Sequence, residues 1–302
     1  MRHLITIREM TKGDVEEVFR IAADLKDKWS RGVREPVLPG RMLALIFEKQ
    51  SLRTRVSFES AMVHLGGGSI VLGEDAGFGK RESIADFARV LSRMVDGIVV
   101  RAKRHQTVVE LAQYATCPVI NGLTDEAHPC QALADLFTLR ERFGNLAGKK
   151  LAWVGDGNNV ARSLAFACDR LGMEFVTATP PGYEFPEEFR QQLARDAPQL
   201  RWTHTDNPKT AVNGAVAVYT DVWASMGQEA ERDRRKLEFA AYQVDAALMK
   251  SAPADAVFMH CLPARRGEEV TDDVMDGPQS IIVEQAANRM HLQKGILAWL
   301  LS

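Results

Sequence analysis

The sequence predicts an α/β fold with two domains, each built on a mainly parallel sheet that is flanked by helices. The chain has 302 residues, which exceeds the usual size of one domain and favours two. Short apolar runs that suit buried strands alternate with longer segments of helical periodicity. Strands that alternate with helices in this way are typical of parallel sheets covered on both faces.

The first part of the chain contains four predicted strands. Thr11 can cap a first helix over 14–26, whose apolar side chains recur at helical spacing. A loop rich in arginine, proline and glycine follows at 31–40. Strands and helices then alternate: strand 42–47, helix 56–65, strand 69–72, helix 83–94, strand 97–100, helix 108–114, strand 118–121 and helix 132–143.

A domain boundary is predicted near residue 145. Residues 144–149 have the turn composition expected between domains, so we expect a first domain over 1–145 and a second over 146–284. The second begins with strand 150–154, a glycine-containing turn and a helix that ends at Leu171. Further strands are predicted at 175–178, 215–219, 256–260 and 280–283, followed by a last helix from 284 onward.

The bulk composition excludes several classes of protein. The net charge is −2, from 38 basic and 40 acidic residues, which does not favour non-specific nucleic-acid binding. No apolar stretch approaches the ~20 residues that a membrane span needs, and the N-terminus lacks the apolar core of a signal peptide. The four cysteines form no CxxC pair, which suits reduced thiols. We therefore expect a cytoplasmic protein without nucleic-acid or membrane partners.

The segment 51–55, Ser-Leu-Arg-Thr-Arg, lies between the strand 42–47 and the helix that follows it. A strand-to-helix turn presents free backbone N–H groups and the positive end of the helix dipole. Two hydroxyls and two guanidiniums added to such a turn favour a phosphate-like dianion. Each residue alone is equally compatible with an ordinary helix start that carries solvated arginines. The cluster as a whole predicts an anion site.

Unusual polar residues recur at the predicted strand ends, where ligands of open α/β sheets bind. Their recurrence is more informative than any one of them, because a single member is compatible with a surface or core role. These residues are Ser51, Arg53, Thr54, Arg101, His128, Gln131, Asn159, Asp221, Ser225, His260, Cys261 and Arg289.

Part of this set suits a phosphate that leaves as a dianion. Arg53, Arg101 and Arg289 can neutralise it together with the hydroxyls at the helix start. His128 and Gln131 are three residues apart at a helix start, so both can reach one small carbonyl or amide, and the histidine is also a possible proton donor. These groups predict a transfer from an acyl phosphate.

The remaining polar residues suit an amine that also carries a carboxylate. Asp221 can bind a substrate ammonium, whereas Asn159, Ser225 and Met226 offer amide or backbone donors for a carboxylate. Because Asp221 and Cys261 have no further carboxylate or second histidine beside them, a metal cage is not predicted. We expect transfer of an acyl group to an amine, without a metal or a cofactor.

The turn Gly155-x-Gly157-x-x-Val160 follows a strand and opens a helix, as a dinucleotide fingerprint does. Valine replaces the third glycine, and Glu174 is poorly placed to bind a ribose. A glycine turn that presents Asn159 is the preferred interpretation, with a nicotinamide-dependent dehydrogenase as an alternative.

Five motifs together resemble the carbamoyltransferase family, and most closely its ornithine branch. Segment 51–55 resembles the family's Ser-Thr-Arg-Thr-Arg loop, and His-Pro-Cys-Gln at 128–131 matches its second signature. Residues 221–227 resemble the Ser-Met-Gly loop of the ornithine branch, and His-Cys-Leu-Pro at 260–263 its cysteine signature. Segment 284–291 is similar to the start of the family's closing helix. The resemblance spans nearly the whole chain.

The resemblance implies transfer of the carbamoyl group of carbamoyl phosphate to the δ-amine of L-ornithine, which gives L-citrulline and phosphate, as in arginine biosynthesis or urea-type metabolism. The first domain would bind carbamoyl phosphate, the second would bind ornithine, and a helix over 285–302 would pack back on the first. The family also implies a homotrimer or a multiple of it. The implied carbamoyl-phosphate ligands are Ser51, Leu52, Arg53, Thr54, Arg101, His128, Gln131, Cys261, Leu262 and Arg289. The implied ornithine ligands are Asn159, Asp221, Ser225 and Met226, and the implied catalytic groups are Arg53, Arg101, His128, Asp221 and Cys261.

Other acceptor amines stay open within the family. Aspartate would call for basic residues around the second substrate, which the set of Asp221 with Ser225-Met226-Gly227 disfavours, and putrescine would leave Ser225 and Asn159 without a carboxylate to bind. N-acylated ornithine is compatible with the same residues. A binding protein that resembles the family but does not turn over is a third class of function, beside the transferase and the dehydrogenase.

Overall fold

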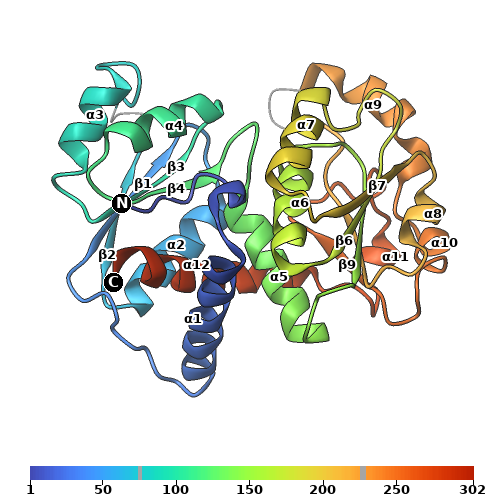
Figure 1. Ribbon diagram of the computed structural model, residues 1–302, viewed down its shortest axis with the longest axis horizontal. Coiled ribbons are helices and arrows are strands. Elements are labelled where there is room, and N and C mark those ends of the chain that lie inside the picture. Colours follow the sequence, from blue (N-terminus) through green and yellow to red (C-terminus); the bar gives the residue numbers. More distant parts are fainter. Residues whose placement is uncertain (74–76, 225–228) are drawn as a thin grey trace. The chain divides into compact units, whose positions relative to one another are not determined.

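The chain folds into two compact units, shown in a computed structural model (Figure 1). The first unit comprises Met1–Phe137 and Ala287–Ser302, and the second comprises Thr138–Ala286. Both passages between the units fall inside helices, one in α5 (Pro129–Phe143) and one in α12 (Ile282–Leu301). The domain limits after 145 and 284 stay predictions of the sequence. The structure describes residues 1–73, 77–224 and 229–302.

The first unit contains a four-stranded parallel sheet in the order β2-β1-β3-β4. Its strands are apolar and β-branched, and alternate side chains point to opposite faces. Ala44 and Ile46 pack with α3 and α4 on one face, while Leu43 lies near Leu301 of α12 on the other. Figure 1 shows α3 and α4 on one side of this sheet and α12 on the other. The elements are η1 (Ile7–Glu9), α1 (Lys12–Ser30), β1 (Met42–Phe47), α2 (Leu52–His64), β2 (Gly68–Leu72), α3 (Ile84–Leu91), β3 (Gly97–Arg101), α4 (His105–Tyr114) and β4 (Val119–Leu123).

The second unit contains a five-stranded parallel sheet in the order β7-β6-β5-β8-β9. Ala152 and Val154 of β5 pack with α8, α10 and α11 on one face, whereas Trp153 stacks on Tyr219 of β8 on the other. The elements are β5 (Lys150–Val154), α6 (Asn159–Leu171), β6 (Glu174–Ala178), α7 (Glu187–Asp196), β7 (Arg201–Thr205), α8 (Pro208–Val212), β8 (Ala217–Thr220), η3 (Glu229–Glu231), α9 (Arg232–Glu238), η4 (Ala240–Tyr242), α10 (Ala246–Met249), β9 (Val257–His260) and α11 (Asp272–Met275). The predicted fold class, two parallel sheets flanked by helices, is confirmed.

The predicted strand over 280–283 is wrong. The segment pairs with β9 through a single bridge at Ser280, and the chain then enters α12 at Ile282. The next ladder position is taken by a side chain, because Gln285 Oε1 accepts a hydrogen bond from the backbone N–H of His260 at 3.0 Å. Helix α12 therefore covers this edge of the sheet, which a further strand would otherwise have extended.

Helix α12 contacts the helices of the first unit, as the resemblance implied. At Gly295 a Cβ atom would lie 2.6 Å from the carbonyl oxygen of Val18 and 2.9 Å from Cβ of Ala22. Only glycine permits so close an approach of α12 to α1. Lys26 lies one turn after Ala22 in α1, and its Nζ donates at 2.7 Å to Oδ1 of Asn288, which lies about two turns before Gly295 in α12. The end of the chain is thus packed onto its first helix.

A buried histidine on α12 makes stability depend on pH. His291 is 3% exposed, and its ring packs edge-on against Trp29 with centroids 5.0 Å apart. Burial, followed by nearby positive charges, lowers the pKa of His291 to about 3. A base with a lowered folded pKa contributes its full stability above its unfolded pKa, about 6.5, and loses it as the pH falls toward the folded pKa.

We expect this histidine to lower the free energy of unfolding by up to about 1.4 kcal/mol per pH unit between about pH 6.5 and 3. Urea denaturation of the wild type and of His291→Gln at several pH values in this window measures the effect. The stability of the variant should fall less steeply. Equal slopes for the two proteins would show that His291 is not the group that titrates.

Candidate active site

Each sheet brings two polar loops together at the point where its strand order reverses. In the first unit the chain leaves β1 toward β2 and leaves β3 toward β4, so the carboxyl ends of β1 and β3 flank a switch point. Ser51 follows β1, and Arg101 is the last residue of β3. In the second unit β5 and β8 are the corresponding pair, and they lead to Asn158 and Asp221. The two sets of candidate residues therefore lie where open parallel sheets bind ligands.

In the first unit, four predicted residues form one hydrogen-bonded network, which we call the anion cluster: Ser51, Thr54, Arg101 and Arg289. Arg101 Nη1 donates to Ser51 Oγ at 2.8 Å, and Ser51 Oγ donates to Thr54 Oγ1 at 3.0 Å. Arg289 Nη2 donates to the same threonine oxygen at 3.0 Å. Two guanidiniums, from β3 and from α12, are thus joined through two hydroxyls at the start of α2.

The anion cluster lies at the N-terminus of a 13-residue helix. Ser51 is the N-cap of α2, and its Oγ accepts a hydrogen bond from the backbone N–H of Thr54. The helix begins at Leu52, so segment 52–55 forms its first turn rather than a loop before it. Leu52 is 74% exposed, so its backbone N–H, rather than its side chain, is the group that it can offer to a ligand. The free N–H groups and the dipole of α2 add to the positive charge here.

His128 lies against the same positive charges. It is 4% exposed and precedes α5. Burial, followed by the charges of Arg289 and Arg101, holds the pKa of His128 well below its ordinary value. The imidazole is therefore neutral near pH 7 and can donate an N–H hydrogen bond rather than a proton. The two arginine charges that oppose protonation of His128 also make the electrostatic potential around its ring positive, which favours binding of an anion.

Gln131 offers an acceptor in the same region. It lies in the first turn of α5 and is 1% exposed. Its Nε2 donates to Asp135 Oδ1 at 2.8 Å, which fixes the orientation of the amide. The opposite atom, Oε1, has no hydrogen-bond partner within the described residues. A buried carbonyl oxygen of this kind suits an amide N–H of a ligand.

In the second unit, Asp221 and Cys261 form a second contact set, the acid–thiol pair. Asp221 follows β8 and is 8% exposed, and Cys261 follows β9. Cys261 Sγ donates to Asp221 Oδ1 at 3.1 Å, and the same oxygen accepts the backbone N–H of Val222 at 2.8 Å. The carboxylate thus has a fixed orientation at the carboxyl edge of the sheet.

The other carboxylate oxygen of Asp221 is held by Asn158. Asn158 Oδ1 caps α6 by accepting the backbone N–H groups of Val160 and Ala161 at 3.0 and 3.1 Å. Its Nδ2 must then point away from the helix, and it donates to Asp221 Oδ2 at 2.8 Å. The contact of Asn158 with Asp221 was missed from the sequence. Asparagine is a preferred N-cap residue, and this preference could have assigned Asn158 to the cap and Asn159 to the first position of α6.

A buried pair supports the backbone around Cys261. His260 Nδ1 accepts the N–H of Leu262 at 2.9 Å, so its proton lies on Nε2, which contacts Glu269 Oε1 at 3.1 Å. Both side chains are fully buried. Leu262 has a φ of 59°, a conformation that a non-glycine residue adopts only where its surroundings impose it. His260 and Glu269 are therefore positioning residues for the loop 261–262, and Glu269 was not predicted.

Asp221, His260 and Cys261 also form a group that could hold a metal ion, since one donor atom of each lies within 4.8 Å of the others. The sequence did not predict a metal cage at these residues. Both ring nitrogens of His260 already have protein partners, so this histidine would have to give up a hydrogen bond to become a ligand. The arrangement of Asp221, His260 and Cys261 is therefore better explained by the hydrogen bond between the thiol and the carboxylate than by metal ligation.

Arg235 supports the other end of the Asp221 loop. Its Nη1 donates to Asp156 Oδ2 at 2.7 Å and to the carbonyl oxygen of Trp223 at 2.9 Å. The guanidinium is stacked over the ring of Tyr183 at 4.7 Å. This arginine was also missed, because no strand end or motif singles it out. The predicted ligands Ser225 and Met226 lie outside the described residues.

The glycine turn does not present an open cradle for a dinucleotide. A Cβ atom at Gly157 would lie 3.0 Å from the backbone of Glu184 and Phe185, and Gly157 N–H donates to the carbonyl oxygen of Tyr183 at 2.9 Å. The glycine is needed because a neighbouring loop packs against the turn, in the place where a pyrophosphate would approach. The dehydrogenase alternative is therefore not favoured.

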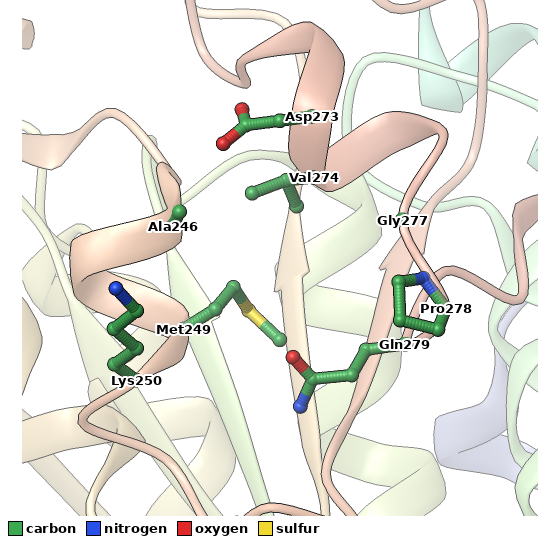
Figure 2. A pocket seen from close by; sticks show the side chains of 8 residues that line it. All are labelled: Ala246, Met249, Lys250, Asp273, Val274, Gly277, Pro278 and Gln279. Atoms are coloured by element: carbon green, nitrogen blue, oxygen red, sulfur yellow. The ribbon is translucent and has the colours of Figure 1, made fainter.

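A surface pocket of about 190 Å³ lies elsewhere in the second unit (Figure 2). Met249 of α10 and Val274 of α11 line it, with Lys250 and Asp273 at its sides. Gln279, also in its wall, donates to the carbonyl oxygen of Ala256, directly before β9. The pocket therefore lies at the amino end of β9, whereas Cys261 follows its carboxyl end. Among the residues that the structure describes, none of the predicted site residues lines it.

Comparison with known proteins supports one family over the whole chain. Residues 2–141 match the family model "Aspartate/ornithine carbamoyltransferase, carbamoyl-P binding domain", and residues 147–300 match "Aspartate/ornithine carbamoyltransferase, Asp/Orn binding domain". The chain is 50% identical to an ornithine carbamoyltransferase of Carboxydothermus hydrogenoformans, over 99% of this chain and 97% of that protein. It is 49% identical to one of Methanopyrus kandleri, over 99% and 97%.

Solved structures give the same result. An ornithine carbamoyltransferase from Pyrococcus furiosus is similar with a TM-score of 0.96 and 48% identity, over 99% of this chain and 97% of that one. One from Thermus thermophilus has a TM-score of 0.89 and 43% identity, over 99% of each chain.

Proposed function

Because the chain belongs to the aspartate/ornithine carbamoyltransferase family, we propose that it transfers the carbamoyl group of carbamoyl phosphate to the δ-amine of L-ornithine, giving L-citrulline and phosphate. The observation that carries this proposal is the likeness, along the whole chain, to relatives named ornithine carbamoyltransferase. The two sets of polar residues supply the groups that the transfer needs, a positive site for a phosphate and a carboxylate for an amine.

The first unit would bind carbamoyl phosphate. The phosphate would lie at the N-terminus of α2 against the anion cluster, with Arg53 and the backbone of Leu52 as further donors. His128, as a neutral N–H donor, would bind the carbamoyl oxygen, and Gln131 Oε1 would accept from the carbamoyl NH₂ group. These donors stabilise the charge that develops on the carbamoyl oxygen and on the leaving phosphate.

The second unit would bind the amine. An alkylamine has a pKa near ~10.4, so it arrives as an ammonium and must lose a proton before it can attack. Asp221 would bind this ammonium, and Cys261 and Leu262 would lie at the place of reaction, with Cys261 taking part in the relay of the proton. Asn159, Ser225 and Met226 would hold the α-amino acid end. The amine nitrogen then forms a bond to the carbamoyl carbon, and the bond from that carbon to the phosphate oxygen breaks.

Assembly and compartment complete the proposal. We expect a homotrimer or a multiple of it, as the resemblance implies, which light scattering of the purified protein can test. A monomer in solution would contradict this expectation. We place the protein in the cytoplasm, because all four cysteines are free thiols. Within the described parts of the chain, no helix has both the length and the apolarity to cross a membrane.

The acceptor can be tested by measuring citrulline-type products from carbamoyl phosphate with four amines in parallel: L-ornithine, N-acetylornithine, putrescine and L-aspartate. Turnover should be found with L-ornithine and be far lower with the other three. A preference for another amine would leave the proposed binding of carbamoyl phosphate standing but would show that ornithine is not the acceptor. No turnover with any of them would favour a binding protein.

Asn158 provides a test of the amine half. We expect Asn158→Ala to lower kcat/KM for ornithine about tenfold or more, since the buried Asp221 carboxylate loses a hydrogen bond worth about 1.5–3 kcal/mol. The KM for carbamoyl phosphate should not change. The matched control is Asn207→Ala, which removes the N-cap of α8 but no contact with Asp221. Both variants lose about 1 kcal/mol of helix capping, so equal kinetic losses in the two would contradict a positioning role.

A further inference from the structure

A second group of basic side chains in the first unit takes no part in the proposed reaction. We call it the basic cluster: Arg34, His64, His291 and Lys294, two of which contact the ring of Trp29. The ring of Trp29 contacts the ring of His291 at 5.0 Å, and Arg34 Cζ lies 5.1 Å from the centre of the indole. The cluster joins the end of α1, the end of α2 and the middle of α12.

Among the described residues the basic cluster forms no ion pair with a carboxylate, and its members range from the buried His291 and Lys294 to the exposed Arg34. Lys294 is 2% exposed, and its one hydrogen bond goes to the carbonyl oxygen of Leu25 at 3.3 Å. Burial, followed by the charge of Arg34, lowers the pKa of Lys294 to about 8. Burial and then the charges of Arg34 and Lys294 also lower the pKa of His64. A buried ammonium that faces another cation is destabilised unless an anion joins it.

The acids nearest in sequence to Arg34 do not fill this role. Glu35 is bound by Lys28 at 2.6 Å, and Lys28 is bound in turn by Asp24 at 2.7 Å. Arg34 itself donates to two backbone carbonyls, those of Trp29 and Val33. Its charge is therefore not neutralised by any ion pair among the described residues.

Three buried ring nitrogens around the cluster have no hydrogen-bond partner within the described residues: Trp29 Nε1, His64 Nδ1 and His291 Nδ1. An indole N–H can only donate, and a neutral imidazole can present an N–H on this atom. A buried donor without a partner costs about 1–3 kcal/mol, so an acceptor bound here would be stabilised by the indole N–H and by each imidazole that carries its proton on Nδ1. Together with a guanidinium and an ammonium, they form a set of donors.

We propose that the basic cluster is a second phosphate-type oxyanion site, separate from the site at Ser51. A tetrahedral oxyanion has enough acceptor oxygens for the guanidinium fork, the ammonium and the ring N–H groups, which a halide ion does not. His64 is the last residue of α2, whereas Ser51 caps its first. Thirteen helical residues separate the two places by about 20 Å at 1.5 Å per residue. Arg34 is exposed, so an ion from solvent can reach the cluster.

The ligand of this site is a phosphate group, which free inorganic phosphate or a larger phosphomonoester can supply. The proposal does not depend on the proposed reaction. Equilibrium dialysis with radiolabelled inorganic phosphate tests it, on the full chain near pH 7, with folding of every variant checked by circular dichroism. We expect the wild type to bind two phosphate ions per chain. Lys294→Met should lose one of them, and Arg53→Ala should weaken the other.

Lys28→Met is the matched control, since Lys28 of α1, next to Trp29 in the sequence, already has two carboxylate partners, Asp24 and Glu35, and this variant should keep both phosphate ions. Arg34→Gln changes an exposed residue and replaces Lys294→Met in the test if the latter does not fold. We expect it to lower the affinity for the second phosphate ion at least tenfold. A wild type that binds one phosphate, or variants of Lys294 and Arg34 that bind as many ions as the wild type, would overturn the proposal.

Displacement of the second ion by an equal concentration of glycerol phosphate would indicate a phosphomonoester as the ligand, and retention would indicate free phosphate. If Arg53→Ala leaves binding unchanged, the assignment of Arg53 fails while the second site stands.

Discussion

Replacing Arg53 with alanine should lower kcat about 10²–10³-fold, because one preorganised charge that stabilises the departing phosphate is removed. Arg53 lies in the first turn of α2, two residues after the N-cap Ser51, where the helix dipole and the anion cluster already favour negative charge. Steady-state citrulline formation at saturating substrates measures the loss. Thermal unfolding should change by only a few degrees, since the residue is only partly buried.

Arg55→Ala is the matched control for this prediction. Arg55 lies two residues further along the same helix, is exposed, and pairs with Glu59 through its Nε at 3.0 Å. Such a surface pair contributes about 0–1 kcal/mol, so we expect turnover within about twofold of the wild type. If Arg53→Ala turns over as fast as Arg55→Ala, the phosphate does not bind at the start of α2.

Replacing Asp221 with asparagine should lower kcat/KM for ornithine about 10²-fold or more. The amide keeps the size of the side chain but removes the charge that binds the ammonium, and interactions of this kind with a charged group amount to about 3 kcal/mol or more when one partner is lost. In the wild type both carboxylate oxygens accept hydrogen bonds, from Asn158 Nδ2 and from Cys261 Sγ. The asparagine NH₂ group would face one of these two donors and could not accept its hydrogen bond. The KM for carbamoyl phosphate should stay within about twofold.

Asp273→Asn is the matched control in the same unit. Asp273 is exposed and lies beside the pocket at the amino end of β9, so its charge cannot assist an amine bound beyond the carboxyl ends of the strands. We expect unchanged kinetics for both substrates. Equal losses in Asp221→Asn and Asp273→Asn would mean that overall charge, rather than the acid–thiol pair, governs binding of the amine.

The fold could be predicted because its signals are local. Strand β1 is a run of apolar residues, and Ser51 marks the start of the next helix by a preferred N-cap. The segment 280–283 has the same apolar composition, yet it makes one bridge and continues as a helix. The side chain of Gln285 replaces a ladder bond there, and composition alone does not show such a substitution. Strand β7 was not predicted, because its edge position leaves it largely polar and exposed.

The candidate site could be predicted only where a residue would contact the proposed ligand in its own right. Arg101 and Asp221 stand at strand ends, and that position alone marks them. Asn158, Glu269 and Arg235 act through other residues, by contacts that only the tertiary structure creates. Their partners are 9 to 63 residues away in the sequence, so neither periodicity nor spacing indicates them.

The central claim is that one reaction joins the phosphate-binding half and the amine-binding half of the chain. Carbamoyl phosphate labelled with ¹³C in its carbonyl group, incubated with the protein and L-ornithine, tests this claim by nuclear magnetic resonance together with a phosphate assay. We expect labelled citrulline and phosphate in equal amounts, and no phosphate above the rate of spontaneous breakdown when ornithine is left out. Enzyme-dependent release of phosphate without labelled citrulline would contradict the account, since it would mean that water rather than the amine attacks the carbamoyl carbon.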